Sequence, residues 1–256
     1  MHAFTSPTAH CQIRWMDLPG NGIPLVMIHG LGCAASYEYP PLARLSPLQG
    51  RRMILVDLPG YGYSDKPDDF PYTTTAQAQV VTELLTHLHP GRVVLYGHSM
   101  GGSISIEVAT TLGERLAGLV VSEPNFYPGG GFFSKRIAAF SEQQYITTVH
   151  RRMIRDEHSP WAGCMAAASP RAVWRSAQGL VNSQVDWLAH YCRLPVPTRL
   201  LFGEHSLPDA GFDTLQRRGN AVQVLPGCGH SMSWEAPAAL AQALGEFCQQ
   251  VERPVT

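Results

Sequence analysis

Residues 92–102, RVVLYGHSMGG, decide the fold of this chain. A short apolar, β-branched run leads into a Gly-x-Ser-x-Gly motif, and a helical pattern over residues 103–112 follows at once. Strand, tight turn and helix form the context in which this motif exposes its serine hydroxyl at the edge of a sheet. Gly97 and Gly101 lack a Cβ that would clash in such a turn. We therefore expect Ser99 to be a nucleophile.

Length and composition exclude several classes of function. The chain has 256 residues, enough for one large α/β domain with an inserted subdomain and a sizeable core. Charged residues make up only 15% of the chain, and 19 Lys and Arg nearly balance 20 Asp and Glu. Nucleic acid and anionic lipid both attract a basic excess, so we expect neither as a partner.

The sequence also bears on location and redox state. Residues 1–15 contain no basic segment followed by an apolar run, and no stretch is long and apolar enough to span a bilayer. The six cysteines are scattered without a Cys-x-x-Cys pair, which favours reduced thiols over a disulfide framework or a zinc site. We therefore expect a cytoplasmic protein with no membrane span.

Short apolar runs recur along the chain, and each is typical of a strand buried on both faces of a parallel sheet. They cover residues 24–28, 53–56, 93–96, 119–122, 198–202 and 221–225. Residues 11–15 alternate weakly and predict an early strand on the sheet edge, while residues 74–88 and 237–251 have helical spacing. These elements predict an α/β fold with a mostly parallel central sheet flanked by helices, which binds ligands at the carboxyl ends of its strands.

Residues 126–194 have a different character from the rest of the chain. A hinge-like break at residues 128–131 precedes a helical pattern for which Ser134 is a candidate N-cap. The pattern is rich in aromatic and charged residues and has no strand-like run. We expect a helical cap over residues 126–194, inserted into a core of residues 1–125 and 195–256, with an apolar pocket on its underside.

A second glycine-rich turn, at residues 29–32 (HGLG), ends the apolar run of residues 24–28. It lies one strand upstream of the serine turn, so its backbone amides can face the same point. We expect the N–H groups of Leu31 and Met100 to form an oxyanion hole. The side chain of His29 is interpreted as a structural hydrogen-bonding group.

A loop rich in Gly, Pro and Asp follows the run of residues 53–56 and predicts a turn that shapes one wall of the site. Its carboxylates, Asp57 and Asp65, are interpreted as groups that fix the loop through local hydrogen bonds.

Four motifs in this order and spacing resemble those of α/β-hydrolase fold enzymes with a helical cap. They are HGLG at 29–32, DLPGYGYS at 57–64, GHSMGG at 97–102 and GH at 229–230. The resemblance implies a serine nucleophile, a histidine base after the last strand, and a carboxylate between them in the sequence. Dehalogenases and epoxide hydrolases of this family resemble each other in using an aspartate nucleophile, and Ser99 argues against both.

Of the eleven histidines, His230 alone follows the last predicted strand in a Gly-flanked loop that can reach back to Ser99. We expect it to be the general base. Its position agrees with the one that the family resemblance implies.

The acid is where the chain departs from the family, because Ser206 stands where members usually carry aspartate. A carboxylate must orient the base and stabilise its charged form. Glu123 is the first choice, with Asp209 and Glu204 as alternatives. Pro124 predicts an extended backbone at Glu123. We expect a carboxylate oxygen of Glu123 at about 2.6–3.2 Å from Nδ1 of His230.

These parts predict a serine hydrolase of small or medium carboxylic esters, which works through an acyl-enzyme and has an apolar substrate pocket. No ligand cluster or phosphate-binding loop competes, so we expect no metal and no organic cofactor. The expected partner is a small ester-like substrate, and the expected state is a monomer or homodimer.

Alternatives remain at the level of the sequence, because one fold hosts many chemistries. A carbon–carbon bond hydrolase or a lactonase would share this architecture; His98 stands where many carbon–carbon hydrolases have Asn, which weighs against them. Outside enzymes, a capped hydrolase can serve as a small-molecule receptor with vestigial turnover.

Overall fold

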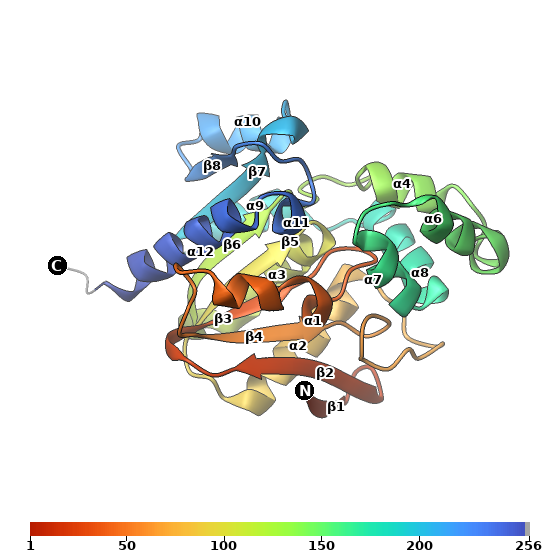
Figure 1. The fold of residues 1–256 in the computed structure, drawn as a ribbon, viewed down its shortest axis with the longest axis horizontal. Coiled ribbons are helices and arrows are strands. Elements are labelled where there is room, and N and C mark those ends of the chain that lie inside the picture. Colours follow the sequence, from red (N-terminus) through yellow and green to blue (C-terminus); the bar gives the residue numbers. More distant parts are fainter. Residues whose placement is uncertain (254–256) are drawn as a thin grey trace.

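An eight-stranded sheet forms the centre of the computed structural model, which describes residues 1–253 (Figure 1). Its strands are β1 His2–Ser6, β2 Cys11–Leu18, β3 Asn21–Ile28, β4 Arg51–Asp57, β5 Val93–His98, β6 Leu116–Ser122, β7 Thr198–Gly203 and β8 Val222–Leu225. Their order across the sheet is β1-β2-β4-β3-β5-β6-β7-β8. The β1/β2 and β2/β4 pairings are antiparallel and the other five are parallel. The mostly parallel α/β fold expected from the sequence is confirmed.

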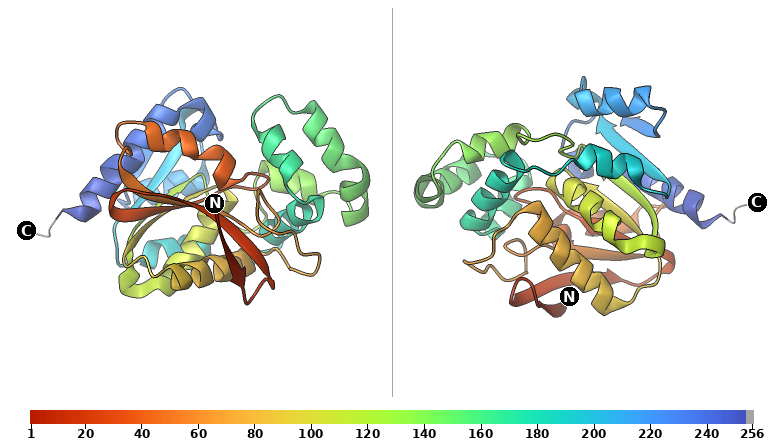
Figure 2. Two further views of the ribbon diagram at one scale, coloured as in Figure 1. Left: turned by 60° about the horizontal axis from the view of Figure 1, so that its bottom comes forward. Right: turned by 180° about the vertical axis from the view of Figure 1, so that it is seen from behind.

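The sheet separates two apolar cores because side chains alternate along each strand. In β3, Val26 packs into one core and Leu25 into the other. Helices cover both faces, which explains why the central strands are apolar on both sides (Figure 2). The first face carries α2 Thr74–Leu88 and α3 Met100–Leu112, and the second carries α1 Ala35–Glu38 and α12 Pro237–Glu252.

Between β6 and β7 the chain forms a helical insertion (residues 126–194), and no strand occurs in it. Its elements are α4 Phe132–Ala138, α5 Glu142–Gln144, a π-helical turn Tyr145–Val149, α6 His150–Asp156, α7 Trp161–Ala167, α8 Pro170–Val181 and α9 Trp187–Arg193. The helices α4, α6, α7 and α8 gather at one end of the sheet (Figure 1). The last helix, α9, instead packs on α3, where the Trp187 indole N–H donates to Glu107 Oε1 at 2.8 Å.

Several elements were not expected from the sequence. β1 pairs outside β2, so β2 is the second strand rather than the edge strand that residues 11–15 predicted. The short helices α10 Ala210–Arg217 and α11 Met232–Glu235 also escaped notice. In α4 the N-cap is Gly131, and Ser134 occupies the third helical position, where its Oγ accepts the Gly131 N–H. The expectation that Ser134 is the N-cap is therefore wrong, because the helix begins two residues before it.

The prediction of a helix over residues 74–88 is confirmed. α2 spans Thr74–Leu88 as its spacing indicates, and Thr73 Oγ1 accepts the Ala76 N–H at its start. All six cysteines are free thiols, and five of them are buried. Within residues 1–253, none of the helices has the length and apolarity needed to cross a bilayer.

Candidate active site

Ser99 lies on the turn between β5 and α3, with φ 53° and ψ −121°. An L-residue rarely adopts this conformation, and it persists only where the surroundings impose it. A Cβ on Gly97 would lie 2.2 Å from the Gly101 carbonyl oxygen, and one on Gly101 would lie 2.4 Å from the Ile28 and His29 carbonyl oxygens. The turn closes only because both flanking residues are glycine.

His230 and Glu123 meet at the carboxyl edge of the sheet, although 107 residues separate them in the chain. His230 Nδ1 lies 2.6 Å from Glu123 Oε2. The other oxygen, Glu123 Oε1, accepts the Gly203 N–H at 2.9 Å. The contact predicted from the sequence between these two side chains is therefore present.

Opposing influences act on the Glu123 carboxyl, whose side chain is only 7% exposed. Burial raises its pKa, but the hydrogen bond and charge of His230 lower it, as do the Gly203 N–H and the Ser206 side chain. The net result is a pKa below the usual value, because hydrogen bonds to the charged form outweigh its desolvation. The structure thus favours an ionised Glu123 beside the imidazole.

The backbone at Glu123 differs from expectation. Its φ is 43°, in the left-handed region, so the prediction that Pro124 holds it extended is wrong. A following proline disfavours the right-handed helical region, but it does not by itself select the extended one. Three contacts hold Glu123 in this backbone conformation. Its carboxylate contacts His230 and Gly203, and its N–H donates to the Leu201 carbonyl at 3.1 Å.

The two alternative acids are engaged elsewhere in the described residues. Glu204 Oε2 accepts the Gly227 N–H at 2.9 Å. Asp209 Oδ1 caps α10 by accepting the N–H groups of Gly211 and Phe212 at 2.8 and 2.9 Å. Both carboxylates stabilise loops rather than contact His230.

His98, next to the serine, faces the core side of the turn. Its Nδ1 lies 2.9 Å from Ser122 Oγ, which also lies 2.9 Å from the Tyr96 hydroxyl. Burial and the charge of the nearby His230 lower the pKa of His98 to about 3, so its ring is neutral. The His98 and His230 rings are 4.6 Å apart, which places His230 beside the serine turn.

The second glycine-rich turn lies against the first. A Cβ on Gly30 would lie 3.3 Å from Ser99 Cβ. Met100 is the first residue of α3, so its N–H has no acceptor within the helix. Neither this N–H nor that of Leu31 donates a hydrogen bond to any residue among 1–253. Both N–H groups are therefore without a protein acceptor in this part of the chain.

His29 fixes the orientation of this turn. Its Nε2 accepts the Leu58 N–H at 3.1 Å, and an amide can only donate, so the ring proton sits on Nδ1. Nδ1 then donates to the Gly30 carbonyl at 2.8 Å. Burial lowers the pKa of His29, more strongly than the charge of Asp57 raises it. The structural role expected for His29 is confirmed.

The carboxylates of the following loop anchor it through hydrogen bonds, of which only that of Asp57 with Tyr63 is local as expected, while Asp65 bonds to β2. Asp57 accepts the N–H and the hydroxyl of Ser36 at 2.9 and 2.6 Å and the Tyr63 N–H at 3.0 Å. Asp65 accepts the Gln12 N–H at 2.9 Å.

The helical insertion contributes an aromatic wall. The Phe133 ring of α4 lies 6.4 Å from the His230 ring and 5.0 Å from the Trp161 ring of α7. The Trp161 indole N–H donates to the Leu31 carbonyl at 3.0 Å. The insertion therefore contacts both the predicted base and the predicted oxyanion turn.

One buried carboxyl at the site was missed by sequence reasoning. Glu38, at the end of α1, is 3% exposed and accepts the Ser233 hydroxyl at 2.6 Å. Burial raises its pKa to about 7, although hydrogen bonds from Ser233 and Cys33 and the charge of His230 lower it. Nothing in the local sequence distinguishes Glu38 from a solvated helix residue, because its burial depends on α11, 195 residues later in the chain.

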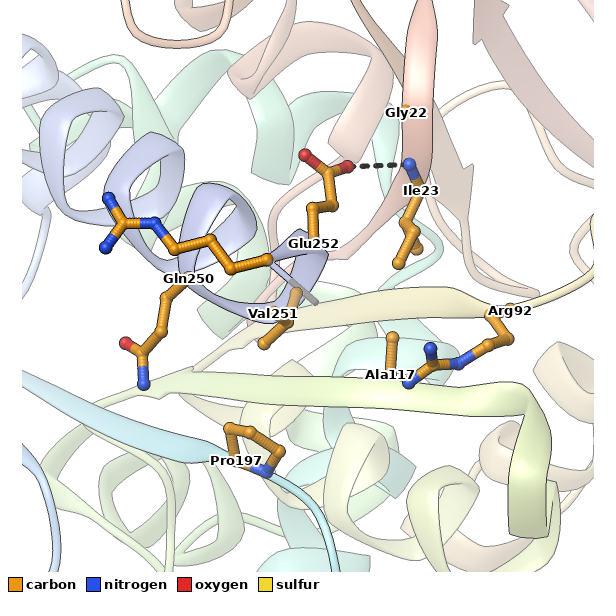
Figure 3. Close-up of a pocket in the computed structure, with 9 residues that line it drawn as sticks. Gly22, Ile23, Arg92, Ala117, Pro197, Gln250, Val251 and Glu252 are labelled. Carbon is orange, nitrogen blue, oxygen red and sulfur yellow. Dashed lines mark hydrogen bonds between the residues drawn. The ribbon is translucent and has the colours of Figure 1, made fainter. Parts of the chain in front are cut away.

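A cavity of about 680 Å³ lies away from this site. Gly22, Arg92, Ala117 and Pro197 line it at the amino ends of the parallel strands, beside the end of α12 (Figure 3). Glu252 crosses it to accept the Ile23 N–H at 2.7 Å. Among residues 1–253, no group of three His, Cys, Asp or Glu side chains is placed to hold a metal ion.

Comparisons with known proteins identify the family and the fold. The Alpha/beta hydrolase family matches residues 25–243. Haloalkane dehalogenase 2 of Mycobacterium tuberculosis is 28% identical over 92% of this chain and 91% of its own. The acetyltransferase component of the acetoin cleaving system of Pseudomonas putida is 38% identical over 117 residues. That match covers 42% of this chain and only 28% of the relative.

Solved structures share the whole fold. An esterase of Thermogutta terrifontis superposes with a TM-score of 0.81 at 23% identity, over 98% of this chain and 99% of its own. The N-acyl homoserine lactonase AidH gives a TM-score of 0.77 at 21% identity, over 100% and 98%. At 21–23% identity, these structures show a shared fold only. The family match, in contrast, covers residues 25–243, which is most of the sequence. The chain belongs to the alpha/beta hydrolase family.

Proposed function

We propose that this protein is a serine hydrolase of small or medium carboxylic esters. The observation that carries the proposal is the 2.6 Å contact between Glu123 and His230 at the sheet edge that also bears Ser99. A carboxylate on Nδ1 leaves Nε2 of the same imidazole free to accept a proton. The esterase that shares this fold is consistent with the proposal.

In the proposed reaction, Ser99 Oγ attacks the ester carbonyl while His230 Nε2 takes its proton. Glu123 stabilises the imidazolium, and the N–H groups of Leu31 and Met100 donate to the oxyanion. Collapse of the tetrahedral intermediate breaks the carbonyl–alkoxide bond, and His230 returns the proton to the leaving alcohol. Water, deprotonated by His230, then attacks the acyl-enzyme, and the acid leaves as Ser99 recovers its proton.

The helical insertion acts as the cap in this proposal. Phe133 and Trp161 offer an apolar aromatic wall beside His230, which suits an apolar acyl or alcohol group. A dehalogenase activity, as named for the mycobacterial relative, is disfavoured because a serine stands at the predicted nucleophile position. A lactone presents the same carbonyl to the same groups, so lactones belong in the substrate panel beside linear esters.

A fluorophosphonate probe tests the nucleophile. We expect stoichiometric labelling of Ser99 in the wild type, and loss of both labelling and ester turnover in Ser99→Ala, because no other group supplies the attacking oxygen. Peptide mapping locates the label, and p-nitrophenyl esters of increasing acyl length measure turnover. Labelling at another residue, or near-normal turnover in Ser99→Ala, would disprove the assignment.

Charge-neutral substitutions test the acid. Glu123→Gln keeps the shape but removes the charge on His230 Nδ1, and we expect kcat to fall by about 10³-fold or more. Glu204→Gln and Asp209→Asn are matched controls, because each removes a carboxylate from the same edge without touching His230. A larger loss of kcat in either control than in Glu123→Gln would remove Glu123 from the mechanism.

A further inference from the structure

The residue expected to supply an oxyanion amide is held on both sides, by different parts of the protein. The Leu31 N–H belongs to the peptide whose carbonyl is that of Gly30. That carbonyl accepts His29 Nδ1 at 2.8 Å and the Cys33 N–H at 3.2 Å, so the core anchors the carbonyl end of this peptide. The next carbonyl, that of Leu31 itself, accepts the indole N–H of Trp161 at 3.0 Å. Its partner is 130 residues away, on α7 of the helical insertion.

α7 packs on this turn without spare room. A Cβ on Gly32, whose φ is +72°, would lie 2.3 Å from Met165 Sδ and 2.8 Å from Trp161 Nε1. The hydrogen bond is buried, so water does not compete for the Leu31 carbonyl. Leaving a buried carbonyl without a donor costs free energy, so the Leu31 carbonyl stays directed at the Trp161 indole.

We propose that Trp161 is a positioning residue for the oxyanion amide of Leu31, so that the placement of the helical insertion sets the geometry of the oxyanion hole. This inference rests on the serine-hydrolase function proposed above. The indole fixes the carbonyl of Leu31 while the core fixes the carbonyl before it. These two anchors, one on each side of the Leu31 N–H, together fix the direction in which it points. Misplacement of a catalytic group by about 1 Å can cost about 10²-fold in rate.

The chain supplies a matched control in the same insertion. Trp174 of α8 donates its indole N–H to the Phe140 carbonyl at 2.8 Å. This bond has the same donor and acceptor types as the Trp161 bond, but it lies entirely within the insertion. Trp174→Phe therefore removes an equivalent hydrogen bond and leaves the Leu31 carbonyl untouched.

The first measurement compares ester turnover in Trp161→Phe and Trp174→Phe. Because the Leu31 donor is loosened rather than removed, we expect Trp161→Phe to lower kcat about tenfold, less than the loss for a deleted donor. KM should stay within about twofold, since the ground-state carbonyl uses the donor weakly. Trp174→Phe should keep the kcat of the wild type.

The second measurement separates the hydrogen bond from packing, since Trp161 also contacts Phe133. Replacement of Trp161 by benzothienylalanine keeps the shape of the indole and puts sulfur in place of the N–H. We expect the same loss of kcat, and an equal loss of affinity for an arylboronic acid, whose tetrahedral adduct on Ser99 occupies the oxyanion site. Affinity for the product carboxylic acid should not change.

Two results would overturn the inference: wild-type kcat and boronic acid affinity in the benzothienyl protein, or an equal loss of kcat in Trp174→Phe. The first would reduce Trp161 to a packing residue, and the second would assign the effect to the stability of the insertion. Failure of the wild type itself to react with fluorophosphonate and to turn over esters would instead refute the proposed function, and the inference with it.

Discussion

Two residues at the site carry backbone strain that their side chains would normally avoid. Ser99 and Glu123 have φ values of 53° and 43°, and neither is glycine. Conformations of this kind cost on the order of 1–3 kcal/mol each and persist where the surrounding structure imposes them. The proposed nucleophile and acid therefore occupy positions where stability is given up for geometry.

This strain predicts the stability of variants at Ser99. Ser99→Gly removes the Cβ that makes the conformation unfavourable, whereas Ser99→Ala keeps it. We expect the Gly variant to be more stable than the Ala variant by about 1 kcal/mol, after the entropic cost of glycine in the unfolded chain. Urea unfolding at one pH measures both. An Ala variant as stable as the Gly variant would show that the turn is unstrained.

At the same scale, Glu123 could be predicted from the sequence because Ser206, at the usual position of the acid, carries no carboxylate. The acid therefore had to come from the end of a neighbouring strand. Sequence reasoning failed on the backbone of Glu123, because a rule about the residue before proline says nothing of the hydrogen bonds that bend the chain there. It failed on Glu38 because burial by a distant helix leaves no local signal.

Among the elements, the turn between β5 and α3 brings α3 against the end of β3. A Cβ on Gly101 would lie 2.4 Å from two carbonyl oxygens at the end of β3, those of Ile28 and His29. These acceptors are backbone atoms and cannot rotate away. The close approach of helix and strand therefore depends on one missing methyl group.

Paired glycine substitutions test this packing. Gly101→Ala should destabilise the protein by about 3 kcal/mol or prevent folding, because overpacking forces backbone shifts. Gly163→Ala, inside α7 with no atom within 4 Å of the added Cβ, should stabilise it by roughly 0.5–1 kcal/mol through helix propensity. Thermal unfolding of the two variants compares them. A mild effect of Gly101→Ala would contradict the close approach.

Elements differed in how well the sequence predicted them. α2 has fifteen residues of helical spacing and a threonine cap, and its bounds were predicted without error. β1, α10 and α11 have five, eight and four residues, too short for periodicity to mark them. The order of the strands across the sheet was not predicted, because spacing along the chain does not show which strands become neighbours.

For the whole molecule, the sequence predicted a helical segment between β6 and β7 but not which surfaces it would contact. Apolar residues at helical spacing show that a helix packs, without showing against what. The indole of Trp161 and the ring of Phe133 reach the site only because α4 and α7 are placed over it.

Global stability should carry a pH dependence from Glu38. Its pKa is about 7 in the folded protein and 4.5 as an unperturbed group, so between these values the folded state holds a proton that the unfolded state has lost. Stability then falls as pH rises from 4.5 to 7 and levels off above. The full difference is about 3 kcal/mol.

Urea unfolding at pH 5, 6, 7 and 8 tests this for wild type and Glu38→Gln. The neutral side chain cannot ionise, so the variant should gain stability relative to wild type as pH rises. The lowered pKa of Glu123 acts in the opposite direction and at lower pH, because the stability that it contributes is present above the unfolded value of 4.5 and is lost only as pH falls below that value. The difference in stability between Glu123→Gln and wild type should therefore change little between pH 5 and 8. A constant difference between Glu38→Gln and wild type would contradict the raised pKa.

The pairing of Glu123 with His230 spans the helical insertion, and this has a practical consequence. Ser99, Glu123 and both proposed oxyanion amides precede the insertion, while His230 alone follows it. A chain divided in the glycine run at residues 129–131 would put the proposed base on one polypeptide and its partners on the other. Neither fragment would hydrolyse an ester alone, so the appearance of coloured product would report the encounter of two fused proteins, each carrying one half.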